Sequence, residues 1–215
     1  MKYKNIVFYG GSSEITLELI KLYFEETEKI FIFSRKLKTV NDLISKDIYF
    51  KNKIITKIKV IECNLSNYEE VLNIVNNNIN ELSGLIWVAG FTGDPDLEYN
   101  DINLIKKNLT INFLNPTILI NEFSKKLIPH SNSFICVITS VAGLRGRKTQ
   151  LFYSPAKAGL ITYLSGLRQK LSVKNIHVCT VIPGYINTKP FREGNWKSLG
   201  FLITSPKECA YSMKK

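Results

Sequence analysis

Short apolar runs alternate along the chain with longer segments in which apolar residues recur at helical spacing. The apolar runs are continuous and contain few alternating polar residues, which is typical of strands that are buried on both faces of a parallel sheet. Six such runs each predict one strand: Asn5–Tyr9, Lys29–Ser34, Lys57–Glu62, Leu85–Ala89, Ser133–Thr139 and Ile176–Ile182.

Helical patterns fill the intervals between these runs. Parallel strands that are joined through helices require right-handed crossovers, so the pattern predicts a doubly wound α/β fold, Rossmann-like, with a six-stranded parallel sheet. Ligands of such a fold bind at the carboxyl ends of the strands. The predicted helices are Ser13–Thr27, Val40–Lys46, Asn67–Glu81, Asp101–Leu127, Tyr153–Val173 and Pro206–Lys215.

Length and composition agree with one globular domain. The 215 residues are 45% hydrophobic and 22% charged, which excludes a chain that is mainly disordered. No run reaches the length of about 18 apolar residues that a membrane-spanning helix needs. Residues 1–5 lead directly into the first apolar run without a signal-peptide core, so we expect a cytoplasmic protein.

The chain is basic, with a net charge of +11 that is unevenly distributed. Residues 1–100 carry 12 Lys or Arg and 14 Asp or Glu, whereas residues 101–215 carry 17 and 4. Two interpretations stay open: ordinary surface lysines that favour solubility, or a second half that meets phosphorylated substrates or, peripherally, an anionic membrane surface. No helix-turn-helix, finger or RNP-type motif is present, so we expect no nucleic-acid partner.

The chain has four cysteines, no two of which are spaced as C-x-x-C, and two histidines. Cysteines of this kind are typical of reduced, small hydrophobic residues in a core. The sequence therefore predicts neither a disulfide framework nor a metal site.

The turn after the first strand reads Gly-Gly-Ser-Ser-Glu-Ile-Thr over residues 10–16. Small residues there let the backbone approach a pyrophosphate, and the following helix offers free N–H groups. The simpler alternative is a tight glycine turn in which Ser13 caps the helix. The cofactor contacts predicted in this turn are Gly10, Ser12, Ser13, Glu14 and Ile15.

The second strand ends in Ser34-Arg35-Lys36 without an acidic residue. An acidic residue at this point usually binds the ribose 2′-hydroxyl of NAD, whereas Arg35 can pair with a 2′-phosphate. Ser34 and Arg35 therefore favour NADP(H) over NAD(H). The alternative is a solvent-exposed basic turn that binds no ligand.

A possible catalytic group lies in the second half of the chain. Tyr153 and Lys157 stand four residues apart, which puts them on one face of a helix. Ser140 ends the fifth strand, Asn112 lies in the long helical segment before it, and Pro183-Gly184 with Thr188 follows the sixth strand. Each residue alone has an ordinary structural explanation. Together, in this order, they resemble the short-chain dehydrogenase/reductase family from Ile6 to about Pro206.

This resemblance implies a single dinucleotide-binding catalytic domain over residues 1–215 that transfers a hydride between NADP(H) and a carbonyl or alcohol. Tyr153 would be the general acid or base, Lys157 would stabilise tyrosinate, Ser140 would polarise the substrate oxygen, and Asn112 would hold a relay water. A homodimer or homotetramer is implied as well. The further cofactor contacts implied are Asn64, Leu65, Ala89, Gly90, Tyr153, Lys157, Pro183, Gly184, Ile186 and Thr188.

Several positions depart from the family pattern. Glu14 and Thr16 replace two turn glycines, Val88 replaces an asparagine, and the chain ends where a seventh strand usually follows. These departures keep open a catalytically silent, NADP(H)-binding regulatory protein of the same fold.

The first turn also has a weaker similarity to reductases of polyprenyl-phosphate-linked keto-sugars, which suggests a phosphorylated or lipid-linked sugar as substrate. Residues 185–204 contain aromatic and basic side chains and would form a small substrate lid. A surface loop packed by its aromatic residues is the alternative.

Overall fold

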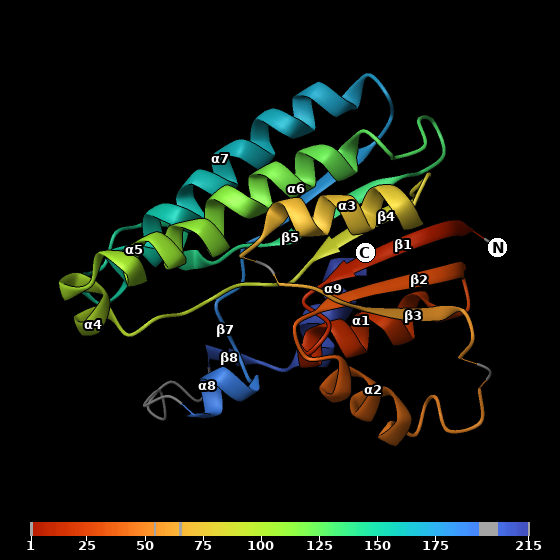
Figure 1. The fold of residues 1–215 in the computed structure, drawn as a ribbon, viewed down its shortest axis with the longest axis horizontal. Helices are drawn as coiled ribbons and strands as arrows, with labels where there is room; N and C mark the ends of the chain where they lie inside the picture. The colour runs from red at the N-terminus through yellow and green to blue at the C-terminus, as the bar shows by residue number, and fades with distance from the viewer. Residues whose placement is uncertain (1, 54, 65, 194–201, 215) are drawn as a thin grey trace.

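The computed structural model describes residues 2–53, 55–64, 66–193 and 202–214. At its centre lies a parallel sheet in the order β3-β2-β1-β4-β5-β6 (Figure 1). The predicted doubly wound six-stranded α/β fold is therefore confirmed, and the strand order reverses between β1 and β4, where such sheets bind ligands. The strands are β1 (Tyr3–Tyr9), β2 (Thr27–Ser34), β3 (Ile58–Glu62), β4 (Gly84–Trp87), β5 (Phe134–Ile138) and β6 (His177–Val181).

Helices cover both faces of the sheet, which explains why the strands are apolar throughout. On one face lie α1 (Glu14–Phe24), α2 (Leu37–Lys46) and α9 (Pro206–Lys214), which pack on Ile6 and Phe8 of β1. On the other face lie α3 (Tyr68–Asn78), α6 (Asn115–Ser124) and α7 (Tyr153–Ser172). Across the described ranges, no helix combines the length and the apolar composition that crossing a bilayer requires.

The long helix predicted over Asp101–Leu127 is interrupted. The structure has α5 (Ile102–Leu109), a π-helical turn η1 (Thr110–Leu114) and then α6. Pro116 explains the change in part, because it has no N–H to donate to the carbonyl of Asn112 in a regular α-helix. A short helix that the sequence pattern did not predict, α4 (Pro95–Asn100), precedes α5 and begins at the capping side chain of Asp94.

The segment after β6 forms a small separate pair of strands. β7 (Tyr185–Ile186) pairs in parallel with β8 (Ile203–Thr204), and α8 (Lys189–Glu193) follows β7 (Figure 1). These elements belong to the predicted lid, whereas its residues Trp196, Leu199 and Phe201 lie outside the described residues. In the described part of the chain, β6 pairs only with β5 and forms an edge of the large sheet.

Candidate active site

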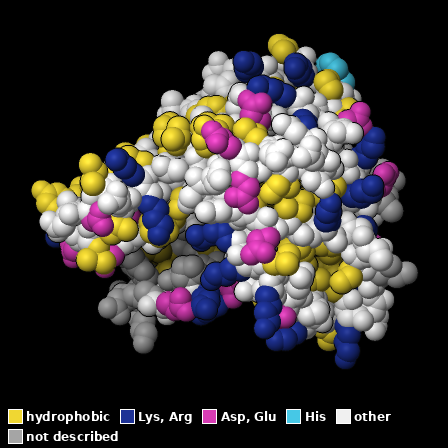
Figure 2. Space-filling model, viewed as in Figure 1, with side chains coloured by type: hydrophobic (Ala, Val, Ile, Leu, Met, Phe, Trp, Pro, Cys, Tyr) yellow, Lys and Arg dark blue, Asp and Glu magenta, His cyan; other side chains and the backbone are white. Residues whose placement is uncertain are grey.

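Two adjoining cavities open at the carboxyl ends of the central strands. The first has a volume of about 360 Å³ and the second about 290 Å³. Tyr153 and Thr188 line both, so the two cavities meet at these residues. Figure 2 shows this side of the molecule hollowed between the α4–α5 end and α8, with Lys and Arg side chains along the border.

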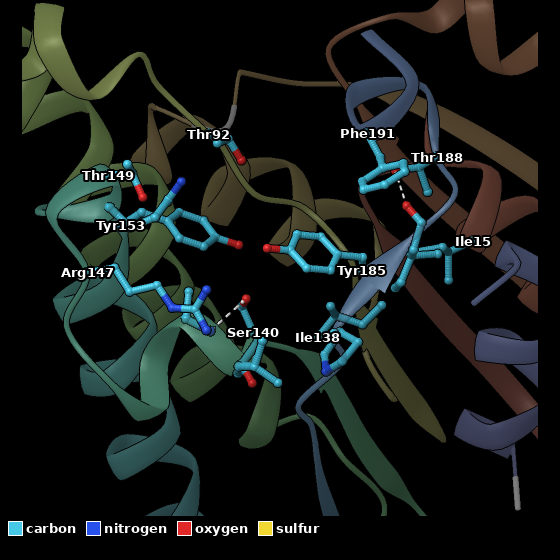
Figure 3. A pocket seen from close by; sticks show the side chains of 17 residues that line it. Ile15, Thr92, Ile138, Ser140, Arg147, Thr149, Tyr153, Tyr185, Thr188 and Phe191 are labelled. Atoms are coloured by element: carbon cyan, nitrogen blue, oxygen red, sulfur yellow. Dashed lines mark hydrogen bonds between the residues drawn. The ribbon is translucent and has the colours of Figure 1, made fainter. Parts of the chain in front are cut away.

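Tyr153 is the first residue of α7, where Pro155 is tolerated because the first turn of a helix leaves its N–H groups without intrahelical partners. Burial raises the pKa of Tyr153 above its usual value, and a hydrogen bond with the Ser140 side chain opposes this rise. Figure 3 shows the hydroxyls of Tyr153 and Tyr185 pointing toward each other across the second cavity. Tyr153 is therefore protonated at neutral pH and is placed as a proton donor.

Ser140 follows β5 and caps a 3₁₀ turn, η2 (Val141–Leu144), with its Oγ accepting a hydrogen bond from the Ala142 N–H at 3.1 Å. The hydroxyl hydrogen of Ser140 is not used in this contact. Ser140 lines the second cavity, beside Tyr153, and so could donate a hydrogen bond to a substrate oxygen.

Lys157 lies one turn after Tyr153 and is 3% exposed. Its Nζ lies 5.5 Å from the centroid of the Tyr153 ring, and burial lowers its pKa to about 8. The stabilisation of tyrosinate by Lys157 that the resemblance implies stays a prediction, because burial and the Ser140 side chain account for the pKa shift of Tyr153.

Asn112 lies in η1 and is fully buried, outside both cavity linings. Its Oδ1 accepts from the Phe91 N–H at 3.0 Å, and its Nδ2 donates to Phe91 O and to Asn108 Oδ1, each at 2.7 Å. A Cβ added at Gly90 would lie 3.3 Å from Asn112 Oδ1 and 3.4 Å from Lys157 Nζ. Gly90 therefore lies close to both side chains; it lines the first cavity together with Lys157, whereas Asn112 lies behind it.

The turn after β1 is as tight as predicted. Gly10 has a φ of 102°, and an added Cβ would lie 2.7 Å from Ala89 N, so this position requires glycine. Ser13 caps α1 through the Ile15 N–H at 3.3 Å. Thr16 replaces a family glycine and donates its hydroxyl to Gly10 O at 2.9 Å, which ties the helix to the turn.

Glu14 is the unexpected charge in this turn. Arg192 of α8 donates from Nη2 to Glu14 Oε1 at 2.6 Å and from Nη1 to Asn187 O at 2.7 Å. The ion pair neutralises the carboxylate at the N-terminus of α1, where a phosphate would bind.

Most of the predicted cofactor contacts gather in the first cavity, with three differences. Pro183, Gly184 and Ile186 line the second cavity and not the first. Asn64 lies in a neighbouring hollow that also contains Arg35 and the carboxylates of Glu62 and Glu70. Leu65 lies outside the described residues. The predicted contacts that do line the first cavity are Gly10, Ser12, Ser13, Glu14, Ile15, Ser34, Arg35, Ala89, Gly90, Tyr153, Lys157 and Thr188.

Other lining residues were not among the predicted catalytic residues and cofactor contacts. Lys36 and Lys189 add positive charge to the first cavity. In the second, Arg147 comes from the basic stretch at 143–148, and Tyr185 follows the Pro-Gly pair. Tyr185 packs against Phe191 with ring centroids 5.7 Å apart. The sequence signals that could have identified Arg147 and Tyr185 are the basic stretch and the Pro-Gly pair beside them.

The first cavity fits a nicotinamide dinucleotide. It offers the close backbone approach at Gly10, the N-terminus of an eleven-residue helix, and basic side chains at Arg35 and Lys36. The Glu14 carboxylate opposes a pyrophosphate, but its pairing with Arg192 offsets that charge.

Comparison with known proteins agrees with this geometry. A family model described as short chain dehydrogenase matches residues 4–197. A 3-oxoacyl-(acyl-carrier-protein) reductase of Rickettsia prowazekii (strain Madrid E) is 31% identical over 194 residues, covering 86% of this chain and 73% of that protein. Carbonyl reductase family member 4 of Xenopus laevis is 25% identical over 213 residues, covering 95% and 87%. The crystal structure of BdcA in complex with NADPH superposes with a TM-score of 0.83 at 18% identity, covering 98% of this chain and 85% of BdcA.

Proposed function

The chain belongs to the short chain dehydrogenase family, and from that premise we propose that it is an oxidoreductase that reduces a carbonyl group with NADPH. The observation that carries the proposal is the place of Tyr153. It lies where the two cavities meet, beside Ser140 in the lining of the second cavity and one turn from the buried Lys157. A proton donor at this junction can reach an oxygen in the second cavity while the first cavity holds the cofactor.

The chain's own residues divide the work of a reduction. Ser140 donates a hydrogen bond to the carbonyl oxygen and polarises it, and Tyr153 donates the proton that the oxygen needs as the alcohol forms. Lys157 is mostly protonated at neutral pH, since its pKa is about 8, and its charge favours the tyrosinate that remains. The hydride would come from NADPH when it is bound in the first cavity. Gly10, the start of α1, Lys157 and Thr188 would hold the cofactor.

We propose NADP(H) as the preferred cofactor on the basis of the turn after β2. Arg35 and Lys36 are exposed there, and both line the first cavity together with Ser34. The Ser34 hydroxyl accepts from the Lys36 N–H at 3.1 Å, which fixes the turn. A 2′-phosphate would find two cations at this position.

The substrate proposed is a carbonyl compound with an apolar part and an anionic group. Arg147 supplies the charge in the second cavity, and Tyr185, Phe191 and Ile138 supply apolar surface. Phosphorylated or lipid-linked keto-sugars and 3-oxoacyl thioesters both have this character. The second class is suggested by the name of the Rickettsia relative.

The experiment is a measurement of NADPH consumption with matched substrates. Acetoacetyl thioesters, phosphorylated keto-sugars and neutral ketones of similar size are compared in wild-type protein, Tyr153→Phe and Arg147→Gln. Loss of about 100-fold or more of the turnover in Tyr153→Phe, with NADPH binding retained, supports the proposal. Arg147→Gln should lose the preference for the charged substrates. A preference that survives in this variant, or equal wild-type activity on charged and neutral substrates, would contradict the anionic preference.

The alternative is a protein that binds NADP(H) without turnover. Glu14 and Thr16 in the phosphate-binding turn are the observations that favour it. Tight NADPH binding without consumption across the whole substrate panel would support this alternative against the reductase.

We also propose that the described lid residues cover the substrate. Tyr185, Ile186 and Phe191 line the second cavity, and Arg192 anchors α8 to the cofactor turn. A homodimer or homotetramer is proposed from the apolar side chains exposed on α5 and η1, among them Ile102, Leu109 and Leu114. Light scattering at several protein concentrations tests the assembly.

A further inference from the structure

A carboxylate is buried behind the proposed catalytic residues. Glu98 of α4 is 4% exposed, and in the described part of the chain Glu98 and Lys157 are the charged residues that are buried. Removing a carboxylate from water is unfavourable unless hydrogen bonds compensate it. Glu98 is not part of either cavity lining, so contact with a ligand does not explain its place.

One asparagine side chain, Asn108, connects Glu98 to Asn112. Asn108 Nδ2 donates to Glu98 Oε1 at 2.7 Å, and Asn112 Nδ2 donates to Asn108 Oδ1 at 2.7 Å. Glu98, Asn108 and Asn112 are all buried, which strengthens each hydrogen bond and excludes competing water. The far end of this row lies against Gly90, close to Lys157 Nζ.

The backbone around Glu98 is shaped to admit it. A Cβ added at Gly93 would lie 1.8 Å from Glu98 Oε1 and 2.5 Å from its Cδ. Gly93 and the α4 helix thus create a place for the carboxylate on the segment that leads from Gly90 and Phe91 to α5. Any side chain at Gly93 would displace Glu98.

The direction of the hydrogen bonds along Glu98, Asn108 and Asn112 determines how the Asn112 amide is oriented. The Glu98 carboxylate accepts from Asn108, so Asn108 turns its NH₂ toward Glu98 and its carbonyl toward Asn112. Asn112 then turns its NH₂ toward Asn108 and Phe91 O, and its Oδ1 toward Phe91 N and the side of Gly90. The carbonyl end of the Asn112 amide therefore faces the Lys157 side, where an NH₂ group would repel the ammonium.

We propose that Glu98 and Asn108 are positioning residues of the catalytic site, acting through Asn112 on the Gly90–Phe91 backbone and on Lys157. The proposal rests on the proposed reductase function. Neither residue touches substrate or cofactor. Their effect is to hold the Gly90–Phe91 backbone, which lines the first cavity together with Lys157, in one arrangement.

The test compares Glu98→Leu and Asn108→Leu with Glu98→Gln, which keeps an acceptor oxygen of the same reach. We expect the two leucine variants to lose about tenfold or more in kcat with little change in KM for NADPH, since small misplacements of catalytic groups have effects of this size. The pH profile of kcat should shift in the same variants. Glu98→Gln should recover most of both properties.

Asp96→Asn is the matched control, because Asp96 is an exposed carboxylate on the same helix α4. If a leucine variant fails to fold, Asn108→Asp replaces it, because aspartate has the size of asparagine but cannot donate to Glu98. Wild-type kcat and pH profile in the substituted proteins, or no recovery in Glu98→Gln, would overturn the proposal.

A second measurement does not depend on turnover. The Phe91 N–H donates to Asn112 Oδ1, so its hydrogen exchange reports on the row directly. We expect faster exchange of this amide in Glu98→Leu and Asn108→Leu and unchanged exchange in Asp96→Asn. Unchanged exchange in the leucine variants overturns the positioning role, whereas absence of turnover in the wild type overturns only the proposed reductase function.

Discussion

Arg192 on α8 and Glu14 at the start of α1 form an ion pair across 178 positions of sequence, with Nη2 2.6 Å from Oε1. The pair joins the lid segment to the turn that would bind a pyrophosphate. Both side chains are partly exposed, so the pair itself contributes little stability. The effect of the ion pair is electrostatic, because Arg192 offsets the negative charge of Glu14 that would otherwise repel an anionic cofactor.

Arg192→Ala should therefore weaken NADPH binding, since it leaves the Glu14 charge unneutralised beside the phosphate site. We expect a loss of about fivefold in affinity at low salt, and less at high salt, where screening reduces the effect. Glu14→Gln in the same protein should restore the affinity. Titration by tryptophan fluorescence measures the NADPH affinity of the wild type, the two single variants and the double variant. Additive effects of the two substitutions on this affinity would contradict the coupling.

Arg35 provides a test of cofactor preference. Arg35→Ala removes one of the two cations in the turn after β2, so NADPH binding should weaken about tenfold while NADH binding stays within about twofold. Competition titrations with NADPH, NADH and 2′,5′-ADP give the three affinities. Lys38→Ala, an exposed lysine of α2 outside the first cavity, is the control. Equal loss for NADPH and NADH would show that Arg35 does not bind the 2′-phosphate.

The burial of Lys157 should be visible in stability. Its pKa is about 8 in the folded chain and about 10.4 when unfolded, so the folded state binds fewer protons between these values. Stability from this group therefore rises as pH increases from about 8 to about 10.4, and the full penalty applies below pH 8. Lys157→Met removes the penalty and should raise the free energy of unfolding at pH 7 by up to about 3 kcal/mol.

Urea denaturation at pH 7 and at pH 10.5 measures this difference. The advantage of Lys157→Met over the wild type should shrink at the higher pH, where the lysine is largely neutral in both states. Lys170→Met, an exposed lysine on the same helix α7, should show no such pH dependence. A less stable Lys157→Met at pH 7 would mean that lost packing outweighs the relieved charge.

The sheet could be predicted from sequence because strands buried on both faces are continuously apolar. β1 and β2 show this directly, because Ile6 and Ile32 on one face and Val7 and Phe33 on the other are all at 0% exposure. The interruption at η1 could not be predicted, because apolar residues continue through it. The missing N–H of Pro116 changes the backbone hydrogen bonds without changing the periodicity of the apolar residues.

The site was predictable only where short motifs mark it. Tyr153, Ser140 and Lys157 stand in such motifs, and the structure brings them together. Glu98 and Asn108 do not, because their pairing depends on the path of the backbone between α4 and α5. Arg192 meets Glu14 only through the fold, so charge counting along the chain could not have found it.

Cysteine provides a last contrast between sequence and structure. The sequence predicts that all four are reduced, small hydrophobic residues of the core, and the sheet register places Cys179 of β6 directly beside Cys136 of β5. Cys136, His177 and Arg168 together lower the pKa of the Cys179 thiol, while the pKa of Cys136 is raised. Cys179 is half-buried, whereas the other three are buried.

Iodoacetamide should therefore modify Cys179 before Cys63, Cys136 and Cys209, because the thiolate is the reactive form. Its rate should fall as the pH is lowered, since protonation removes the thiolate. Cys136→Ala removes the neighbouring hydrogen bond and should slow the reaction at neutral pH, whereas Cys63→Ala on the opposite face of the sheet should not. Peptide mass spectrometry at short reaction times locates the label, and earlier labelling of Cys63 or Cys209 would contradict the lowered pKa of Cys179.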